Sequence, residues 1–351
     1  MMSCKRLDIM KYHAPRKGSL GYVRKRTRRI YPRVISWPDI DAVKPLGFPA
    51  YKVGMLSVVE EYQRERSLFH GIKRAIATTI LEAPPVKVVG IRVYDKTVYG
   101  LKSINEIWTP ELSDPEIKYL SRKTNLPKKV RDEDYFQKKK EALSQELDRL
   151  MNPLVRIIIR TKPELTYIGK KKPEIMEIQI GGSPKDSFNY ALDKLGKDIS
   201  ITEVLETGQF IDSIGVTKGK GFQGVVKRFG VKILPPKTKK EKRAVGSLGP
   251  WTPGRVMWTV PNYGQLGFFK RTEYNKQVLA IITENLEKIN PKGGWLHYGL
   301  IKNPAVIIKG SVQGPPKRLL LLRHAIRPKR AAFKPKLFEL YFNKERLDVP
   351  L

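Results

Sequence analysis

The residues that most suggest a specific chemistry are the three glycines of the segment 219–224 and Lys220 between the first two. They match the pattern G-x-G-x-x-G, and an acid, Glu241, follows the second glycine by twenty residues. This pattern binds a dinucleotide only where a helix opens at the glycines and receives the pyrophosphate. Here Gly230 and the pair Pro235-Pro236 soon break the chain, and Glu241 lies in a run of lysines. The sequence therefore excludes a dinucleotide site.

The same glycines have basic neighbours, which indicates another use. Glycine lets a backbone approach a phosphate closely, while basic groups neutralise its charge. Spacing alone leaves an ordinary basic hairpin turn equally open. The basic neighbours are Lys218, Lys220, Lys227 and Arg228.

Residues that could hold a metal or act as nucleophiles are few and scattered. The four histidines (His13, His70, His297 and His324) do not stand at metal-ligand spacing, and Cys4 is the only cysteine, so neither a zinc site nor an internal disulfide is expected. No G-x-S-x-G or phosphate-binding P-loop motif is present. Acids that could hold magnesium for a nuclease or ligase are scarce where the chain is most basic. We expect no catalytic residue, no metal and no cofactor.

The charge of the chain is large and concentrated. The 351 residues carry 68 Lys and Arg against 34 Asp and Glu, a net +34. Residues 1–40 hold +9, residues 214–271 hold +12 and residues 302–336 hold +10, which leaves about +3 for the other 218 residues. Segments this basic cannot be buried cheaply. A nearly neutral body with three basic segments is typical of a partner of nucleic acid.

Other partners and compartments are less consistent with the sequence. The basic segments contain no amphipathic helix of the kind that binds membrane surfaces. No apolar run approaches the roughly 18 residues of a membrane helix, and the N-terminus has no apolar signal region. We expect a soluble, unprocessed protein of a reducing cytosol, with no membrane partner.

Aromatic residues accompany the basic clusters. Tyr12, Tyr22, Tyr31 and Trp37 lie among the bases of residues 1–40, which favours an RNA-binding arm over a disordered solubilising tail because aromatic rings stack on bases. Trp251, bracketed by glycine and proline, is either a small hydrophobic anchor or a stacking surface at a loop tip, and its basic surroundings favour stacking on RNA. Trp258 lies in a short apolar run and is expected to pack.

The first half of the chain predicts strands and then alternating helices and strands. Strands are expected at 48–59, 72–81, 86–94 and 98–108, with turns at 84–85 and 96–97, as in a barrel or sandwich. Helices are expected at 115–123, 132–151 and 183–195, and strands at 157–160 and 175–180. These alternating elements suggest an α/β insertion within the β domain.

The second half is expected to complete the sheet begun near residue 47. We predict a helix at 275–286 and strands at 297–300, 306–312 and 318–323. The β domain would then be discontinuous in sequence.

A long motif resembles the signature of the universal large-subunit ribosomal protein L-three family. The matching positions are Leu205, Asp212, Gly215, Thr217, Gly219, Lys220, Gly221, Gly224 and Arg228. Further likenesses run through nearly the whole chain, at 15–21, 246–256, 270–276 and 293–299. The length and the insertion at 111–180 resemble the archaeal and eukaryotic branch, so the chain is identified as an archaeal-type member.

The resemblance implies a fold and a domain plan. The fold would be mixed and mainly β, with a six-stranded translation-protein-type β-barrel, an inserted α/β region and long basic RNA-binding extensions. The implied parts are a basic N-terminal arm (1–44), a barrel body (45–110 and 272–351, with strands near 205–217), an α/β insertion (111–204) and a basic central extension (214–271).

The resemblance also implies a function. The chain would be a structural constituent of the large ribosomal subunit in the cytoplasm. It would bind ribosomal RNA near its three-prime end, nucleate subunit assembly and send a loop with Trp251 at its tip toward the peptidyl-transferase centre. Neighbours would be the L-fourteen and L-twenty-four-e families. The candidate RNA-binding residues are Arg16, Lys17, Arg24, Lys25, Arg26, Arg28, Arg29, Lys218, Gly219, Lys220, Gly221, Gly224, Lys227, Arg228, Lys239, Lys240, Lys242, Arg243, Trp251, Arg255, Lys270 and Arg271.

One position departs from the resemblance, and two other classes of function stay open. Many eukaryotic relatives carry a modifiable histidine twelve residues before the tip tryptophan, where this chain has Lys239, so we do not expect that modification. A general nucleic-acid-compacting protein would bind DNA and RNA alike. An RNA-modifying enzyme would need a cofactor pocket.

Overall fold

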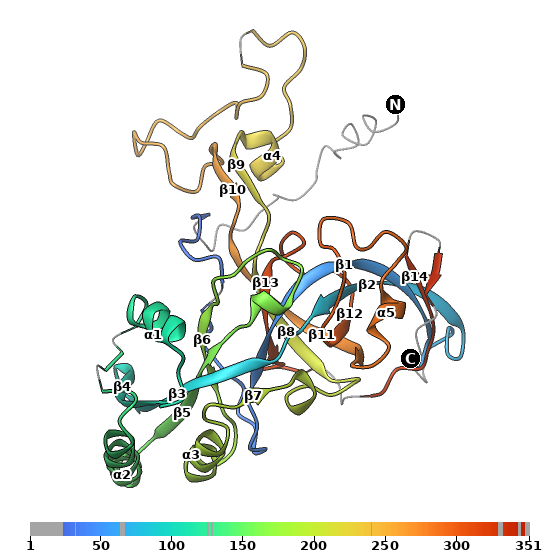
Figure 1. Ribbon diagram of the computed structural model, residues 1–351. Helices are drawn as coiled ribbons and strands as arrows, with labels where there is room; N and C mark the ends of the chain where they lie inside the picture. The colour runs from blue at the N-terminus through green and yellow to red at the C-terminus, as the bar shows by residue number, and fades with distance from the viewer. Residues whose placement is uncertain are drawn as a thin grey trace. The chain divides into compact units, whose positions relative to one another are not determined.

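A computed structural model describes residues 24–31, 33–63, 67–124, 126–127, 129–239, 241–328, 333–342 and 345–347 (Figure 1). The chain divides into two compact units. The smaller unit comprises Met1–Arg29 and Val216–Lys270, and the larger unit comprises Ile30–Gly215 and Arg271–Leu351. We describe each unit by itself.

The main sheet of the larger unit has eight strands in the order β13-β8-β11-β12-β2-β1-β14-β15. A further pairing joins β13 to β1, so the pairings of β1, β2, β12, β11, β8 and β13 run in a closed circuit within the described residues. The strands are β1 (Gly47–Glu61), β2 (Lys73–Glu82), β8 (Phe210–Val216), β11 (Lys270–Ile282), β12 (Ala305–Lys309), β13 (Leu319–His324), β14 (Leu337–Phe342) and β15 (Glu345–Leu347).

The long strand β1 holds this sheet together. Its beginning pairs with β13, its end pairs with β14, and most of its length pairs with β2, all antiparallel. The register shifts between Lys52 and Gly54 and again between Val59 and Glu60. Such irregularities bend a strand and raise its twist, which lets one strand serve three partners. The expectation that strands after residue 300 complete the sheet begun near residue 47 is confirmed by the pairing of β13 with β1 and of β12 with β2.

A second sheet has the order β4-β3-β5-β6, and β7 also pairs with β3. The strands are β3 (Val86–Thr97), β4 (Gly100–Trp108), β5 (Pro153–Arg160), β6 (Ile175–Gln179) and β7 (Asp198–Ile199). From the sequence we grouped 86–108 with β1 and β2, whereas β3 pairs with β4 on one side and with β5 on the other, in this second sheet (Figure 1). Periodicity predicts that a segment is a strand but not which partner it takes. The turn expected at 96–97 lies instead at 98–99, because Lys96 and Thr97 are still paired.

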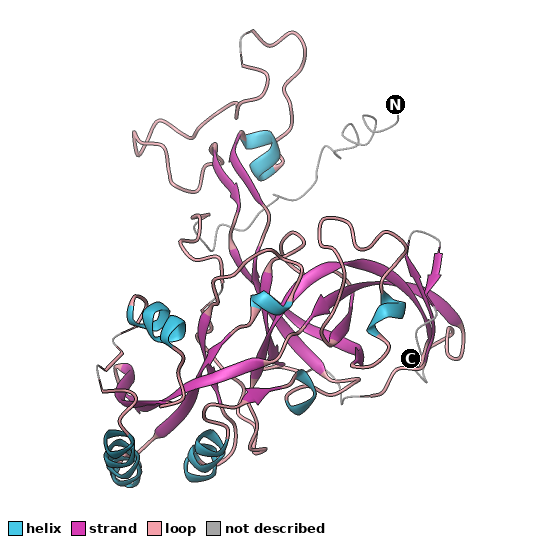
Figure 2. Ribbon diagram, viewed as in Figure 1, coloured by secondary structure: helices cyan, strands magenta, loops and turns pink. Residues whose placement is uncertain are grey.

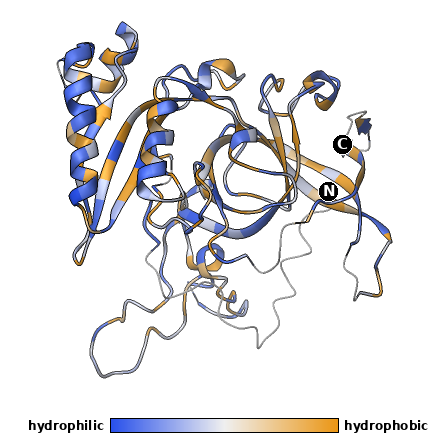
Figure 3. Ribbon diagram, turned by 90° about the horizontal axis from the view of Figure 1, so that it is seen from below, coloured by the Kyte–Doolittle hydropathy of each residue, from blue (hydrophilic) through white to orange (hydrophobic). Residues whose placement is uncertain are grey.

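Helices cover both faces of the second sheet. Leu120 of α1 (Asp114–Ser121) packs with Val89, Trp108 and Ile158 in one cluster. Helices α2 (Glu133–Arg149) and α3 (Pro184–Asp193) pack into the main core through Leu143 and Phe188 respectively. Neighbouring residues of a strand point to opposite faces, so a buried run such as β5 is covered on both sides. Figure 3 shows hydrophilic residues along much of the long helix α2.

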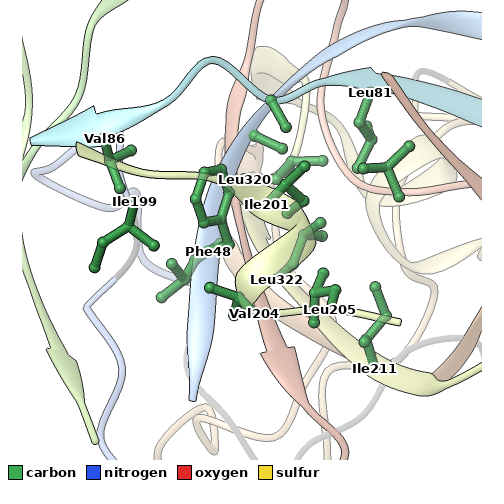
Figure 4. Close-up of a cluster of buried hydrophobic side chains, with 14 of the residues drawn as sticks. Phe48, Leu81, Val86, Ile199, Ile201, Val204, Leu205, Ile211, Leu320 and Leu322 are labelled. Carbon is green, nitrogen blue, oxygen red and sulfur yellow. The ribbon is translucent and has the colours of Figure 1, made fainter. Parts of the chain in front are cut away.

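The core of the larger unit forms where segments distant in sequence meet. Phe48 of β1, Leu81 of β2 and Leu322 of β13 are at most 1% exposed and lie in one cluster (Figure 4). Leu205, the first residue of the sequence signature, belongs to the same cluster and is 1% exposed. Burial of large aliphatic side chains contributes about 1.5–3 kcal/mol each. In the described part of the larger unit, the remaining helices are α5 (Leu286–Ile289) and short 3-10 turns at Pro163–Leu165 and Ile201–Glu203.

Three further local predictions are wrong. The helix predicted at 275–286 is mostly strand β11, in which Val278, Leu279 and Ala280 are all buried; a short run buried on both faces fits a helix or a strand equally well by periodicity. The strand predicted at 297–300 is a tight turn. Trp258, expected to pack, is 72% exposed.

The smaller unit has little regular structure in its described part. It contains strands β9 (Gly219–Gln223) and β10 (Gly264–Gly267) and the one-turn helix α4 (Val225–Phe229). Most of residues 231–263 is loop (Figure 2). In the described part of the whole chain, no helix is both long and apolar enough to cross a membrane.

Candidate nucleic-acid interface

The glycine-rich motif folds as a two-stranded ribbon rather than as a nucleotide-binding turn. Strands β9 and β10 pair antiparallel, with Gln265 opposite Phe222. Gly221 has φ 66° and nothing within 4 Å of a built Cβ, whereas a Cβ on Gly267 would lie 2.0 Å from the carbonyl oxygen of Lys218. Glycine is therefore required at position 267 by close approach and favoured at position 221 by backbone conformation. The glycines shape the ribbon, and its lysines Lys218 and Lys220 flank them.

Arg228 serves inside the smaller unit. Its guanidinium donates to the carbonyl oxygens of Asn262 (2.8 Å), Tyr263 (3.1 Å) and Gln265 (3.1 Å). Partial burial, together with the nearby charge of Arg24, lowers the pKa of Arg228 from its usual value. Arg228 thus fastens α4 to the entry of β10. From the sequence we placed it among RNA-contacting residues, and the structure shows that its hydrogen bonds are internal.

The N-terminal basic residues lie against this unit through aromatic rings. The guanidinium of Arg24 lies 4.1 Å from the ring centre of Phe229, and that of Arg26 lies 5.3 Å from the ring centre of Phe268. The amide of Thr27 donates to the carbonyl oxygen of Phe268 at 3.0 Å. Such cation–π contacts hold a basic group while leaving its charge available. Of the same segment, Lys25, Arg26, Arg28 and Arg29 are exposed.

The loop 231–263 exposes apolar and basic side chains together. Trp251 is 96% exposed and Trp258 is 72% exposed. A few backbone hydrogen bonds, such as Gly254 to Trp251 (2.8 Å) and Leu234 to Lys242 (3.0 Å), define its turns. Large exposed aromatic rings can stack on unpaired nucleotides, while neighbouring lysine and arginine side chains neutralise the phosphates. The exposed basic residues are Lys232, Lys237, Lys239, Lys242, Arg243 and Arg255.

An aromatic pair on the ribbon was missed by sequence reasoning. Phe222 and Tyr263 lie 5.4 Å apart between ring centres and are 71% and 62% exposed. Phe222 falls at a variable position of the glycine motif, so only its presence between two glycines could have indicated a displayed ring. The pair adds a second stacking surface to the unit that carries Trp251.

Several signature residues have structural roles in the larger unit. Asp212 is fully buried and accepts hydrogen bonds from Arg323 (2.6 Å) and from the backbone amide of Asn275 (3.0 Å). Arg323 also donates to the carbonyl oxygen of Ser36 at 2.6 Å. A buried charge is tolerated when it is paired and hydrogen-bonded in this way. Part of the signature therefore records a folding requirement.

The candidate residues do not all lie in one unit. Those of 24–29, 218–228, 239–255 and Lys270 belong to the smaller unit, whereas Arg271 belongs to the larger unit, where its carbonyl oxygen accepts from Gln313 at 3.3 Å. Arg16, Lys17 and Lys240 lie outside the described residues. Among the described residues, no three His, Cys, Asp or Glu side chains gather as a metal site would require.

The chain is similar over nearly its whole length to a known protein family. Residues 7–346 match the family model described as ribosomal protein L3. The chain belongs to the ribosomal protein L3 family. Among its curated relatives, the large ribosomal subunit protein uL3 of Archaeoglobus fulgidus is 47% identical over 328 residues, which are 92% of this chain and 95% of that protein. The uL3 protein of Methanocaldococcus jannaschii is 48% identical over 325 residues, which are 91% and 93% of the two chains.

These matches confirm the family that the sequence motifs indicated. The resemblance to the family, in its archaeal form, is confirmed by these matches. The family is a structural component of the ribosome rather than an enzyme, which removes the RNA-modifying enzyme from the alternatives. The chain is accordingly a structural ribosomal protein of the large subunit.

Proposed function

We propose that this chain binds large-subunit ribosomal RNA directly, near the three-prime end of that RNA, and helps to nucleate assembly of the subunit. The observation that carries the proposal is the loop 231–263, which displays Trp251 at 96% exposure among exposed bases. Such a loop gains order from a polyanion whose bases can stack on its rings. Its lysines and arginines replace counterions along the RNA backbone.

The proposal assigns different tasks to the two basic regions of the smaller unit. Residues 24–29 follow the RNA backbone, since four of their five bases are exposed. The loop reaches toward the peptidyl-transferase centre with Trp251 at its tip, as the family resemblance implies. The ribbon β9–β10, fastened by Arg228, is the rigid base from which the loop extends.

The proposal extends to the body and its neighbours. The closed circuit of strand pairings supports the six-stranded barrel that the resemblance implies. A basic arm (1–44), a barrel body, an α/β insertion and a central extension (214–271) are part of the same proposal. The insertion, expected from the sequence at 111–204, would begin at β3, because β3 and β4 share a sheet with β5 and β6. The protein partners would belong to the L-fourteen and L-twenty-four-e families, within the cytoplasmic ribosome.

A competition experiment tests the proposal. The full chain is bound to large-subunit ribosomal RNA made in vitro, and either duplex DNA or unlabelled RNA of equal phosphate content is added. We expect RNA to compete far better than DNA, because stacking on Trp251 needs unpaired bases. Equal competition would mean a general nucleic-acid-compacting protein and would overturn the proposal.

A further inference from the structure

The motif at 293–299 has no part in the function proposed above, although it is one of the landmarks of the sequence. It folds as a tight knob, in which the amide of Trp295 donates to Gly299 O (2.8 Å) and the amide of Gly299 donates back to Trp295 O (3.1 Å). Trp295 and Tyr298 are 3% exposed, whereas Leu296 is 72% exposed and His297 is also exposed. The knob thus buries two aromatic anchors and displays the two residues between them.

The displayed histidine has an unusual backbone conformation. His297 has φ 61°, in the left-handed region that side chains other than glycine seldom adopt. A conformation of this kind persists only where the surrounding structure imposes it, and it is commonest at binding sites. The side chain at this position, rather than the turn alone, therefore needs an explanation.

A buried carboxylate fixes the segment that follows the knob. Glu82, at the end of β2, is fully buried. It accepts hydrogen bonds from the hydroxyl of Tyr298, from the amides of Lys302 and Asn303 (3.0 Å each), and from Nδ2 of Asn303 (2.8 Å). Burial, and the carboxylate of Glu82 beside it, raise the pKa of Tyr298 above its usual range, so its hydroxyl remains a donor. Four donors on one carboxylate make this segment rigid.

The same segment is joined to a second loop. Nδ2 of Asn303 also donates to Leu165 O (3.1 Å), and the ammonium group of Lys302 lies 4.6 Å from the ring centre of Tyr167. A Cβ on Gly299 would lie 3.0 Å from Tyr167, so that ring packs directly on the knob. The loops 160–172 and 291–303 therefore form one surface of the larger unit, which we call the loop-pair surface.

The loop-pair surface is strongly basic. The two loops contain seven Lys and Arg and one acid, Glu164. Three of the bases are neutralised within the unit, since Arg160 pairs with Glu116 and Glu164, Lys162 with Asp198, and Lys170 with Glu174. Four others are exposed and form no ion pair with the described residues, namely Lys171, Lys172, Lys292 and Lys302.

We propose that the loop-pair surface is a second RNA-binding site, which takes the phosphate backbone of large-subunit RNA while the knob presents Leu296 and His297 to the nucleotides. This inference rests on the proposed function, and it adds a contact made mostly outside the three basic segments, since only Lys302 of the four lysines belongs to one of them. Lysine is depleted from protein–protein interfaces, whereas phosphate contacts use it freely, and histidine can stack on bases. The four exposed lysines, with only isolated apolar residues among them, favour RNA over a protein partner.

Salt dependence of binding tests this proposal directly. The full chain with Lys171→Gln, Lys172→Gln and Lys302→Gln is titrated with large-subunit ribosomal RNA made in vitro at several salt concentrations. Removing one lysine–phosphate pair lowers the slope of log affinity against log salt by about 0.7–0.9, so the triple variant is expected to lose about 2. The matched control carries Lys96→Gln, Lys102→Gln and Lys118→Gln, three exposed lysines of the same unit that form no ion pair with the described residues, and should keep the full slope.

The outcomes separate this inference from the proposed function. A loss of slope in the first variant alone supports the loop-pair surface. An equal loss in both variants, or a loss in neither, overturns it. A third variant, with Lys239→Gln, Lys242→Gln and Arg243→Gln in the loop 231–263, reports on the proposed function separately, because it should lose slope whether or not the body binds RNA.

The displayed histidine has its own test. Glycine adopts a φ of 61° without strain, so His297→Gly removes the side chain and leaves the knob folded. The affinity for the same RNA should fall severalfold with the salt slope unchanged. An unchanged affinity would overturn the assignment of the knob to the RNA contact.

Discussion

Asp212 and Gly215 show how single residues of the signature contribute to the fold. Asp212 is buried against Arg323, and a Cβ added to Gly215 would lie only 2.3 Å from Cδ2 of Leu320. Both positions belong to β8, which pairs with β13 at this point. Neither requirement is visible in the sequence, because Leu320 and Arg323 lie more than a hundred residues away. The charge pattern predicted that the signature binds a ligand, whereas internal packing explains why Asp212 and Gly215 stand at their positions.

Gly215→Ala tests that packing. The added methyl group must displace Leu320 or β8, and overpacking of this kind costs about 1–3 kcal/mol. The measurement is the free energy of unfolding in urea, at constant pH and salt. Gly246→Ala is the control, since nothing lies within 4 Å of a Cβ built there and its φ is not positive. Equal stabilities of the two variants would contradict the close approach seen at Gly215.

His324 predicts a pH dependence of stability. It is 1% exposed, and burial, followed by the charge of Lys44, lowers its pKa from 6.5 to about 4. The unfolded chain then binds the proton more readily than the folded chain, so stability is complete above about pH 6.5 and falls as the pH drops toward 4. The loss is on the order of 3 kcal/mol, at about 1.4 kcal/mol for each pH unit.

Urea unfolding between about pH 4 and pH 7 measures this loss. His324→Gln should remove much of the pH dependence in this window, whereas His70→Gln, which changes an exposed imidazole, should retain it. A wild-type stability that stays level across the lower half of this window is inconsistent with a neutral buried imidazole.

Among the secondary-structure elements, the ribbon β9–β10 shows best what the sequence can and cannot predict. Its glycines look like a cofactor motif, but they allow the close approach of two strands from which a loop extends. The rejection of a nucleotide site could be argued from sequence, since no helix opens at the glycines. The pairing of 219–223 with 264–267 could not, because forty residues of mostly irregular chain separate the two strands. Arg228 connects them by hydrogen bonds to three carbonyl oxygens, a role that a basic residue in a basic segment does not reveal.

Arg228→Ala is predicted to loosen this ribbon. Hydrogen bonds from charged groups contribute about 1.5–3 kcal/mol, so amide hydrogen exchange in Gly219–Gln223 and Gly264–Gly267 should be at least about tenfold faster in the free protein. The control is the neighbouring Lys227→Ala, which removes an exposed charge but none of the hydrogen bonds that Arg228 donates, and it should leave the exchange rates unchanged. Exchange that is equally slow in both variants would show that Arg228 does not fasten the ribbon.

The larger elements show which sequence signals suffice. Strands β1 to β4 and helices α1 to α3 lie close to their predicted ranges, since long periodic segments with caps such as Ser183 carry local signals. Strand β11 was mistaken for a helix because both of its faces are buried. Strand partners are set by tertiary contacts, which explains why β3 and β4 were placed in the wrong sheet.

Across the chain as a whole, the net charge of a segment does not tell which of its basic residues are available to bind RNA and which form ion pairs inside the fold. Within the basic segment 302–336, Lys309 pairs with the buried Glu60 and Arg323 pairs with Asp212. In the nearly neutral remainder of the chain, by contrast, acids such as Asp198 and Glu174 form internal ion pairs, and three lysines of the loop-pair surface (Lys171, Lys172 and Lys292) have no acidic partner among the described residues. Counts of Lys and Arg along the sequence therefore overestimate the charge that 302–336 can offer to RNA. They also miss the unpaired lysines of the loop-pair surface.

Trp251→Ala tests the separation of the loop from the folded body. Because its side chain is 96% exposed, the free energy of unfolding should change by less than about 0.5 kcal/mol. Chemical probing of the large-subunit RNA in mutant ribosomes should change at nucleotides near the peptidyl-transferase centre. An identical probing pattern in mutant and wild-type ribosomes would count against the proposed position of the loop.

Ultraviolet crosslinking in cells, followed by sequencing of the RNA attached to this chain, would identify the RNA that the chain contacts. We expect crosslinks at a few sites of large-subunit ribosomal RNA, one of them near the peptidyl-transferase centre and formed by the loop that contains Trp251. Crosslinks scattered over many transcripts, or confined to sites distant from that centre, would contradict the proposed function.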